Sequence, residues 1–206
     1  MRLADPLDDL LQSRSHVKVL RALVRLPKGI DASIREIARR AGITHPTAST
    51  VLEHLRAQGI VIARTTLLAS EYHLNVDHVL AKRLEELFRF ESGVKQDVLA
   101  FLADGIRSRA PWAKEAYLFG SAAWGEMRPD SDLDVAVIGP PRKGPKLATI
   151  LQELGEDSLA RFGNRVQAVI GTKPIEELAA RGNRGYRLWR DIAKDGIRFW
   201  PPDGEV

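Results

Sequence analysis

The chain has 206 residues, enough for one large domain or two small ones, and its 44% hydrophobic and 28% charged residues are typical of globular proteins. No apolar run approaches the roughly 20 residues of a membrane helix, and the N-terminal segment lacks the pattern of a secretory signal. The chain has no cysteine, which excludes disulfides, thiolate catalysis and cysteine-bound zinc. We therefore expect a cytoplasmic protein that makes no contact with a membrane.

The excess positive charge lies entirely in the N-terminal third. The formal net charge is +4, and residues 1–75 hold 11 Lys and Arg against 7 Asp and Glu, while the rest of the chain holds 20 of each. Positive charge favours polyanionic partners through counterion release. A surplus of this size is common on ordinary surfaces, so it indicates nucleic-acid binding only together with a structural motif.

The first 60 residues predict three helices. Apolar side chains at helical spacing predict the first over residues 7–26. Ser33, with Glu36 three residues later, forms a capping box that starts the second helix, and Gly42 ends it. Thr44 caps the third helix, which runs to Gly59. Its inward-facing residues are expected to be Ala48, Val51, Leu52 and Leu55.

Two β-rich runs within residues 60–75 predict a hairpin after the third helix. Two short helices around a glycine turn, followed by a hairpin, describe a winged helix-turn-helix. The stretch from Ser33 to Asn75, which opens SIREIARRAGITHPTAST, resembles the winged-helix domains of MarR- and ArsR-like bacterial transcription regulators. The resemblance implies binding to double-stranded DNA, as a homodimer because such domains usually bind paired half-sites.

That binding mode places the first turn of the third helix in the major groove. The residues expected to contact DNA are Arg39, His45, Thr47, Ser49, Thr50 and Arg64. The first turn offers no Arg, Asn or Gln for bidentate contacts to a base, so we expect modest sequence specificity. A solvated basic helix face is the alternative interpretation of Arg39 and its neighbours Arg35 and Arg40.

The rest of the chain predicts a helical segment and then alternating strands and helices. Residues 76–110 predict two helices with a break at Ser92 and Gly93. The alternation that follows favours an α+β domain with a mixed sheet. Its strands are expected at residues 115–119, 133–138, 165–170 and 197–200, with helices from residue 121, over 146–162 and within 174–194.

The stretch LFGSAAWGEMRPDSDLDVAVIG, residues 118–139, places two aspartates at the head of a strand. Side chains alternate along a strand, so Asp132 and Asp134 project to the same side. Like charges this close repel unless a cation lies between them, and Mg²⁺, or Mn²⁺ in its place, suits two carboxylates that share it with phosphate oxygens. Gly120 and Ser121, at a strand-to-helix turn, can bind the phosphates of an NTP through backbone N–H groups and a hydroxyl.

Either half of this pattern alone is most often an ordinary cap or surface turn. Together they resemble the signature of the DNA polymerase beta-like nucleotidyltransferase superfamily, with its Gly-Ser turn, a further glycine and Ser-Asp-x-Asp. The resemblance implies that Asp132 and Asp134 are metal ligands and catalytic residues, and that Gly120, Ser121 and Ser131 contact the nucleotide. It also implies transfer of a nucleoside monophosphate from NTP to an acceptor hydroxyl, with pyrophosphate leaving. The residues that match the signature are Gly120, Ser121, Gly125, Ser131, Asp132 and Asp134.

One position departs from the pattern of active members, which carry a third carboxylate on a neighbouring strand. By strand order that position is Gln167, whose amide has no charge and cannot accept a proton from an acceptor hydroxyl. Glu156 and Asp157 are candidates to replace it. Two hypotheses follow: a DNA-binding transcriptional regulator whose transferase site is weakened or lost, or an active transferase acting on nucleic acid, protein or a small molecule, including in a toxin–antitoxin system.

The expected fold class is α+β, with a winged helix-turn-helix and a nucleotidyltransferase fold whose mixed β-sheet is flanked by helices. We place the winged-helix domain at residues 1–75, a helical connector at residues 76–110, and the nucleotidyltransferase-fold domain at residues 111–206.

Overall fold

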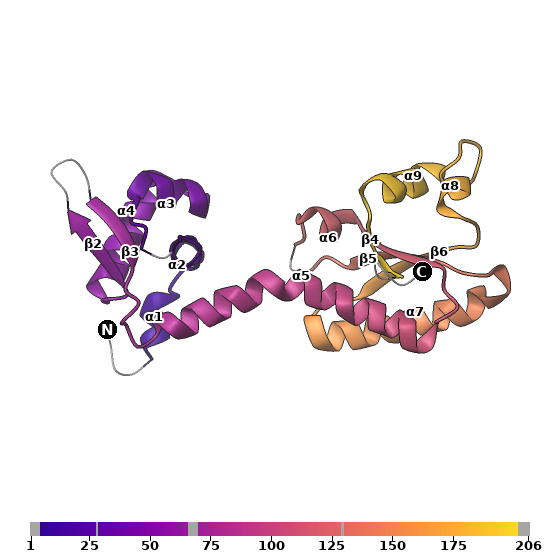
Figure 1. Cartoon of the computed structure of the whole chain (residues 1–206), viewed down its shortest axis with the longest axis horizontal. Coiled ribbons are helices and arrows are strands. Elements are labelled where there is room, and N and C mark those ends of the chain that lie inside the picture. Colours follow the sequence, from indigo (N-terminus) through magenta and orange to yellow (C-terminus); the bar gives the residue numbers. More distant parts are fainter. Residues whose placement is uncertain (1–4, 28, 66–69, 129, 202–206) are drawn as a thin grey trace. The chain divides into compact units, whose positions relative to one another are not determined.

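The computed structural model describes residues 5–27, 29–65, 70–128 and 130–201. The chain divides into two compact units, Met1–Gly93 (unit 1) and Val94–Val206 (unit 2), and each has its own hydrophobic core. Figure 1 shows the elements of both units in sequence colours. In the part of the chain that the structure describes, no helix has both the length and the apolar character needed to cross a membrane.

Unit 1 has the expected winged helix-turn-helix fold. The second and third predicted helices are α3 and α4, and the turn between them holds Gly42 at φ +60°, a conformation that favours glycine. Strands β2 and β3 form an antiparallel hairpin, and its loop, residues 66–69, lies outside the described residues. The elements of this unit before the long helix are α1 (Pro6–Leu10), α2 (Arg14–Val24), β1 (Ala32–Ser33), α3 (Ile34–Ala41), α4 (His45–Ala57), β2 (Val61–Thr65) and β3 (Ser70–Leu74), with sheet order β1-β3-β2.

The single helix expected over residues 7–26 is wrong, because the structure has two helices there. The hydroxyl of Ser13 accepts a hydrogen bond from the backbone N–H of His16, so Ser13 caps a new helix in the middle of the apolar pattern. Only half of the capping box at Ser33 forms. The hydroxyl of Ser33 accepts a hydrogen bond from the backbone N–H of Glu36. The carboxylate of Glu36 binds Arg39 and Arg40 of α3 instead of the backbone N–H of Ser33.

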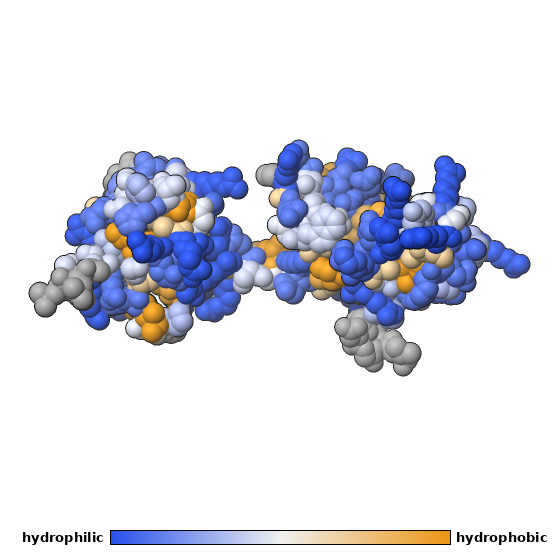
Figure 2. All heavy atoms as spheres, turned by 90° about the horizontal axis from the view of Figure 1, so that it is seen from above, coloured by the Kyte–Doolittle hydropathy of each residue, from blue (hydrophilic) through white to orange (hydrophobic). Residues whose placement is uncertain are grey.

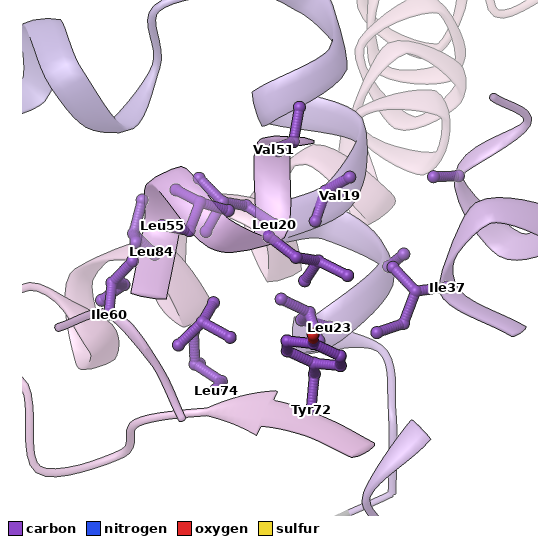
Figure 3. Packing of buried hydrophobic residues seen from close by; sticks show 14 of the residues in the cluster. Val19, Leu20, Leu23, Ile37, Val51, Leu55, Ile60, Tyr72, Leu74 and Leu84 are labelled. Atoms are coloured by element: carbon purple, nitrogen blue, oxygen red, sulfur yellow. The ribbon is translucent and has the colours of Figure 1, made fainter. Parts of the chain in front are cut away.

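The core of unit 1 lies between its helices and the inner face of β3. Figure 3 shows side chains from α2, α3, α4 and the start of α5 (Ala81–Arg109) converging over Tyr72 and Leu74. All four residues that were expected to face inward from the third helix are buried: Ala48, Val51, Leu52 and Leu55. This packing fixes which side of α4 remains available to a partner.

The break expected at Ser92 and Gly93 is wrong, because α5 continues through both residues. The hydroxyl of Ser92 donates to the carbonyl of Arg89 one turn earlier, so it does not compete with the helix. Gly93 has open space around its Cα, and a glycine inside a helix costs only about 1 kcal/mol relative to alanine. Two weak breakers therefore do not interrupt a helix of 29 residues.

Unit 2 is a mixed four-stranded sheet between two helical layers. Strands β5 and β6 are parallel, and β4 is antiparallel to both β5 and β7. One face packs against α5 and α7, and α8 and α9 cover the other (Figure 1). Besides the end of α5, the elements are β4 (Glu115–Phe119), α6 (Gly120–Trp124), β5 (Leu133–Ile138), the 3₁₀ helix η1 (Pro141–Lys143), α7 (Gly144–Phe162), β6 (Val166–Gly171), α8 (Ile175–Leu178), α9 (Tyr186–Asp195) and β7 (Ile197–Trp200), in sheet order β6-β5-β4-β7.

Candidate functional site

The candidate site lies where β4 ends and β5 begins. Asp134 is paired across the sheet with Phe119 on β4 and with Gln167 on β6, while Asp132 directly precedes β5. Asp134 alternates with Leu133 and Val135, which belong to the core against α5 and α7. Its side chain therefore lies on the sheet face that α8 and α9 partly cover. Asp134 is half-buried and Asp132 is exposed.

A direct contact joins the Gly-Ser turn to Asp134. Gly120 has φ +67°, and a Cβ added to it would overlap the Oδ2 atom of the Asp134 carboxylate. Only glycine satisfies both the backbone conformation and the contact. The turn opens α6, whose first N–H groups have no acceptor within the helix, and Ser121 is half-buried beside them. Lys95 of α5 donates to the carbonyl of Ala123 at 2.8 Å and so fastens α6 to the unit.

The two carboxylates are electrostatically uncompensated. The pKa of Asp134 is raised, first by burial and then by the negative charge of Asp132. Among the described residues, no side chain forms a hydrogen bond or ion pair with either group. Two oxygen-donor side chains on one edge, with unbalanced negative charge, fit a hard divalent cation whose other ligands come from phosphate or water.

The third-carboxylate position is occupied by an amide. Gln167 is in parallel register with Asp134 and is exposed, so the strand alignment expected from the sequence agrees with the sheet. Across the described part of the chain, no group of three or more His, Cys, Asp or Glu side chains lies close enough to hold a metal.

Neither proposed replacement for Gln167 reaches this site. Glu156 and Asp157 are on α7, which packs on the opposite face of the sheet. The carboxylate of Asp157 pairs with the guanidinium of Arg109 at 2.5 Å, at the end of α5. A carboxylate on α7 is thus separated from Asp134 by the sheet itself.

Ser131 is part of the turn that leads into β5. Its hydroxyl accepts a hydrogen bond from the N–H of Arg128 at 2.9 Å, and its carbonyl accepts from the side chain of Asn164 at 2.8 Å. These bonds fix the backbone just before Asp132. Contact between Ser131 and a nucleotide remains a prediction.

The arginines expected to bind DNA are exposed but carry carboxylate partners. Arg39 forms a bidentate pair with Glu36, which also binds Arg40, and these hydrogen bonds lower the pKa of Glu36 to about 2. Arg64 pairs with Asp31 at 3.2 Å. The side chains of Arg39 and Arg64 are 69% and 70% exposed, so a phosphate can reach both. Pairs this exposed contribute little to stability.

The polar residues on the first turns of α4 that were expected to contact DNA differ in whether their side chains already form hydrogen bonds. Thr47 shares a hydrogen bond with the capping residue Thr44, and the hydroxyl of Thr50 donates to the carbonyl of Pro46. His45 is exposed and Ser49 is half-buried. None of these four residues is among the buried residues of α4, and two of the hydroxyls are already engaged locally. His45 and Thr47 are two positions apart, so they point to different sides of the helix.

Sequence reasoning missed a contact between two histidines beneath α4. Nε2 of His16 lies 3.1 Å from Nδ1 of His54, and Ser13 contacts the other nitrogen of His16. Burial, followed by the charge of His54, lowers the pKa of His16. The two residues are 38 positions apart, and only helix packing brings them together. No local sequence signal predicts such a pair.

Family models match two separate segments of the chain. A model described as a nucleotidyltransferase domain matches residues 100–178, and a model described as the MarR family matches residues 13–66. The first match includes the Gly-Ser turn, both aspartates and Gln167. No curated protein matches the sequence significantly.

Three solved structures show weak similarity. One, described as a toxin–antitoxin with AMP-PNP, has 17% identity over 51% of this chain and 74% of its own, with a TM-score of 0.36. The second, a mutant of the toxin–antitoxin MntA-HpeT, has 17% identity over 53% and 74%, with a TM-score of 0.34. The third, PigF with SAH, has 18% identity over 83% and 62%, with a TM-score of 0.27.

Replacing Asp134 with asparagine should stabilise the protein at neutral pH when no divalent cation is present. A carboxyl group with a raised pKa in the folded state favours folding only while it is protonated, so its contribution is lost as pH rises through that pKa. Asp134→Asn should therefore gain roughly 1 kcal/mol at pH 7 and less near pH 4. Urea unfolding of both proteins at the two pH values measures this. A variant less stable than the wild type at pH 7 would contradict the proposed repulsion.

Replacing Gly120 with alanine should cost more stability than the same change at Gly125. Both glycines have positive φ values, +67° and +77°, so alanine is strained at either position by about 1–2 kcal/mol. Only at position 120 does the added Cβ also collide with Asp134. Thermal unfolding with and without Mg²⁺ should show a larger loss for Gly120→Ala and no stabilisation of that variant by Mg²⁺. Equal losses for the two variants would show that the turn does not support the carboxylate.

Proposed function

We propose that this chain, which carries a nucleotidyltransferase domain and an N-terminal MarR-family domain, is a DNA-binding transcriptional regulator whose unit 2 binds an NTP together with Mg²⁺. The observation that carries the nucleotide half of the proposal is the contact between Gly120 and the carboxylate of Asp134, beside Asp132. This contact supports the proposal because it brings a turn suited to phosphate close to two carboxylates suited to a metal ion.

The nucleotide would be held by its triphosphate. Asp132 and Asp134 would bind Mg²⁺, or Mn²⁺, and leave other positions of the cation for phosphate oxygens. The N–H groups at the start of α6 and the hydroxyl of Ser121 would donate to the phosphates. When bound, the cation neutralises phosphate charge and favours displacement at phosphorus. Binding would also offset the burial and, secondly, the negative charge of Asp132, which together raise the pKa of Asp134.

The amide of Gln167 favours a domain that still binds the nucleotide but has a weakened ability to transfer a nucleoside monophosphate. It occupies the register position next to Asp134 but cannot accept a proton from an attacking hydroxyl, and α7 offers no substitute. The second candidate function is an active nucleotidyltransferase that moves a nucleoside monophosphate to an acceptor hydroxyl. The intact pair of aspartates is the observation that favours it.

DNA would be bound by the first turns of α4. His45 and the exposed arginines Arg39 and Arg64 would contact phosphates, and Thr47, Ser49 and Thr50 would lie toward the groove. A homodimer would present two such helices to paired half-sites. Arg39 and Arg64 already pair with Glu36 and Asp31. Part of the free energy gained from each phosphate contact would therefore be offset by the loss or sharing of that ion pair.

The nucleotide proposal predicts Mg²⁺-dependent binding of ATP. Fluorescent ATP titrated into the wild type should bind at least about tenfold more tightly in Mg²⁺ than in EDTA, a difference of about 1.4 kcal/mol. The double variant Asp132→Asn, Asp134→Asn should lose this dependence. Asp130→Asn removes an exposed charge from the same loop and serves as the matched control. Mg²⁺ dependence that survives in the double variant would refute the metal assignment.

The DNA proposal predicts a salt-dependent interaction in which Arg39 takes part. Each phosphate contact to duplex DNA contributes about 0.9 to the slope of log affinity against log salt concentration. Arg39→Gln should therefore lower the slope by about 0.9 on a random duplex, as followed by fluorescence anisotropy. Arg83→Gln, which breaks a similar exposed ion pair on α5, should leave the slope unchanged. A salt-independent affinity of the wild type would rule out groove binding by this unit.

A further inference from the structure

Unit 2 carries a row of cations that the proposed nucleotide site does not use. Five basic residues recur at every third or fourth position through the segment between α8 and the end of α9, and all are exposed. Figure 2, which views the molecule from the side of α8 and α9, shows hydrophilic side chains standing out from this part of the surface. We call this row the arginine ridge: Arg181, Arg184, Arg187, Arg190 and Lys194.

Three cations of the ridge lie on α9 and face solvent because of the way this helix packs, while Arg181 and Arg184 are exposed in the turns before it. Trp189 and Ile192 are the buried residues of α9, and they rest on the core that covers Tyr117 and Ala136. With 3.6 residues per turn, Arg187, Arg190 and Lys194 fall on the side of the helix opposite to those two residues. Helix packing therefore aligns these three cations outward along about 10 Å of helix.

The charge of the ridge is poorly compensated. In the described residues, Arg181 and Arg184 have no carboxylate within ion-pair distance. Arg187 lies over the ring of Tyr186 at 6.0 Å. Arg190 and Lys194 contact only the adjacent aspartates, Asp191 at 3.2 Å and Asp195 at 3.8 Å. Such exposed pairs are weak, so the positive potential remains available to a polyanion.

The ridge shares a face of the sheet with the candidate site. Helix α9 covers the side of the sheet on which Asp134 and Gln167 lie, with Trp189 packed near Gly171 at the far end of β6. After α9 the chain enters β7, where Ile197 pairs with Leu118, two residues before Gly120. The row extends over 14 residues of sequence, so a polyanionic polymer could contact several of its cations at once.

We propose that unit 2 binds single-stranded nucleic acid along the arginine ridge, as a surface distinct from the winged helix. Guanidinium groups form forked hydrogen bonds to phosphates, which a row of arginines can offer to successive nucleotides. An aromatic ring and an exposed apolar side chain lie within the ridge segment itself: Tyr186 is half-buried at the start of α9, with its ring 6.0 Å from the guanidinium of Arg187, and Leu188 is 40% exposed. Aromatic faces stack on unpaired bases, which a duplex keeps inside, so this combination favours a single strand.

The test uses the full chain and a fluorescent single-stranded RNA of about 12 nucleotides, within the usual site size of such surfaces. The triple variant Arg181→Gln, Arg184→Gln, Arg187→Gln should weaken binding at least about tenfold. It should also lower the slope of log affinity against log salt by about 2, at about 0.7 for each lost phosphate contact. The matched control removes three other exposed cations of unit 2: Lys114→Gln, Arg142→Gln, Lys146→Gln. It should bind as the wild type does.

Four further measurements distinguish the ridge from the winged helix, the nucleotide site and an acidic protein partner. The ridge variant should bind duplex DNA and ATP with Mg²⁺ as well as the wild type, whereas Arg39→Gln should leave RNA binding unchanged. RNA binding that is equal in the wild type and the ridge variant would overturn the inference, whatever the nucleotide result. A polyglutamate peptide that binds the ridge more tightly than RNA of equal charge would also overturn it, in favour of an acidic protein partner. Loss of Mg²⁺-dependent ATP binding alone would refute the proposed function and leave the ridge intact.

Discussion

The repulsion between Asp132 and Asp134 is the constraint on which the site depends. Asp132 directly precedes β5 and Asp134 is the second residue of that strand, so the chain holds the two carboxylates one residue apart, and Gly120 lies against the carboxylate of Asp134. Burial and the neighbouring charge raise the pKa of Asp134, and no described side chain offsets either effect. A fold that keeps such an arrangement sacrifices some stability at that point, which is typical of sites that bind a cation or perform chemistry.

The rest of unit 2 holds this arrangement in place. The long pairing of β4 with β5 fixes Phe119 opposite Asp134, Lys95 fastens the far end of α6, and the bonds of Ser131 shape the turn before Asp132. The same sheet register that brings Gln167 beside Asp134 keeps the carboxylates of α7 on the other face. A change at position 167 on β6 would therefore alter the side chains beside Asp134 without altering the framework of the sheet.

The sequence predicted most of this framework because its signals are local. Strand alternation, the Thr44 cap and the Gly-Ser turn depend on neighbouring residues, and the structure confirms each. Two helix boundaries were wrong where weak local signals competed: Ser13 starts a new helix within an apolar pattern, and Ser92 with Gly93 does not end one. The ion pairs of Arg39 and Arg64, the contact of His16 with His54, and the overlap that only Gly120 avoids all depend on packing between segments. Spacing along one chain does not encode such contacts.

The arginine ridge is different, because its three-residue spacing is visible in the sequence. Only the burial of Trp189 and Ile192, however, shows that the cations of α9 face outward.

The most direct test of the central claim is to restore the missing carboxylate. The account holds that the site keeps its nucleotide-binding half and lacks only the group at Gln167 that would accept a proton. Transfer of label from α-phosphate-labelled NTP to acceptors, compared between the wild type and Gln167→Asp in Mg²⁺ and in Mn²⁺, measures this. The account predicts a roughly 10²-fold or larger increase in labelling by the variant, the usual effect of a positioned general base, with unchanged nucleotide affinity. Strong labelling by the wild type that falls in the variant would contradict the account and make the amide a working part of the site.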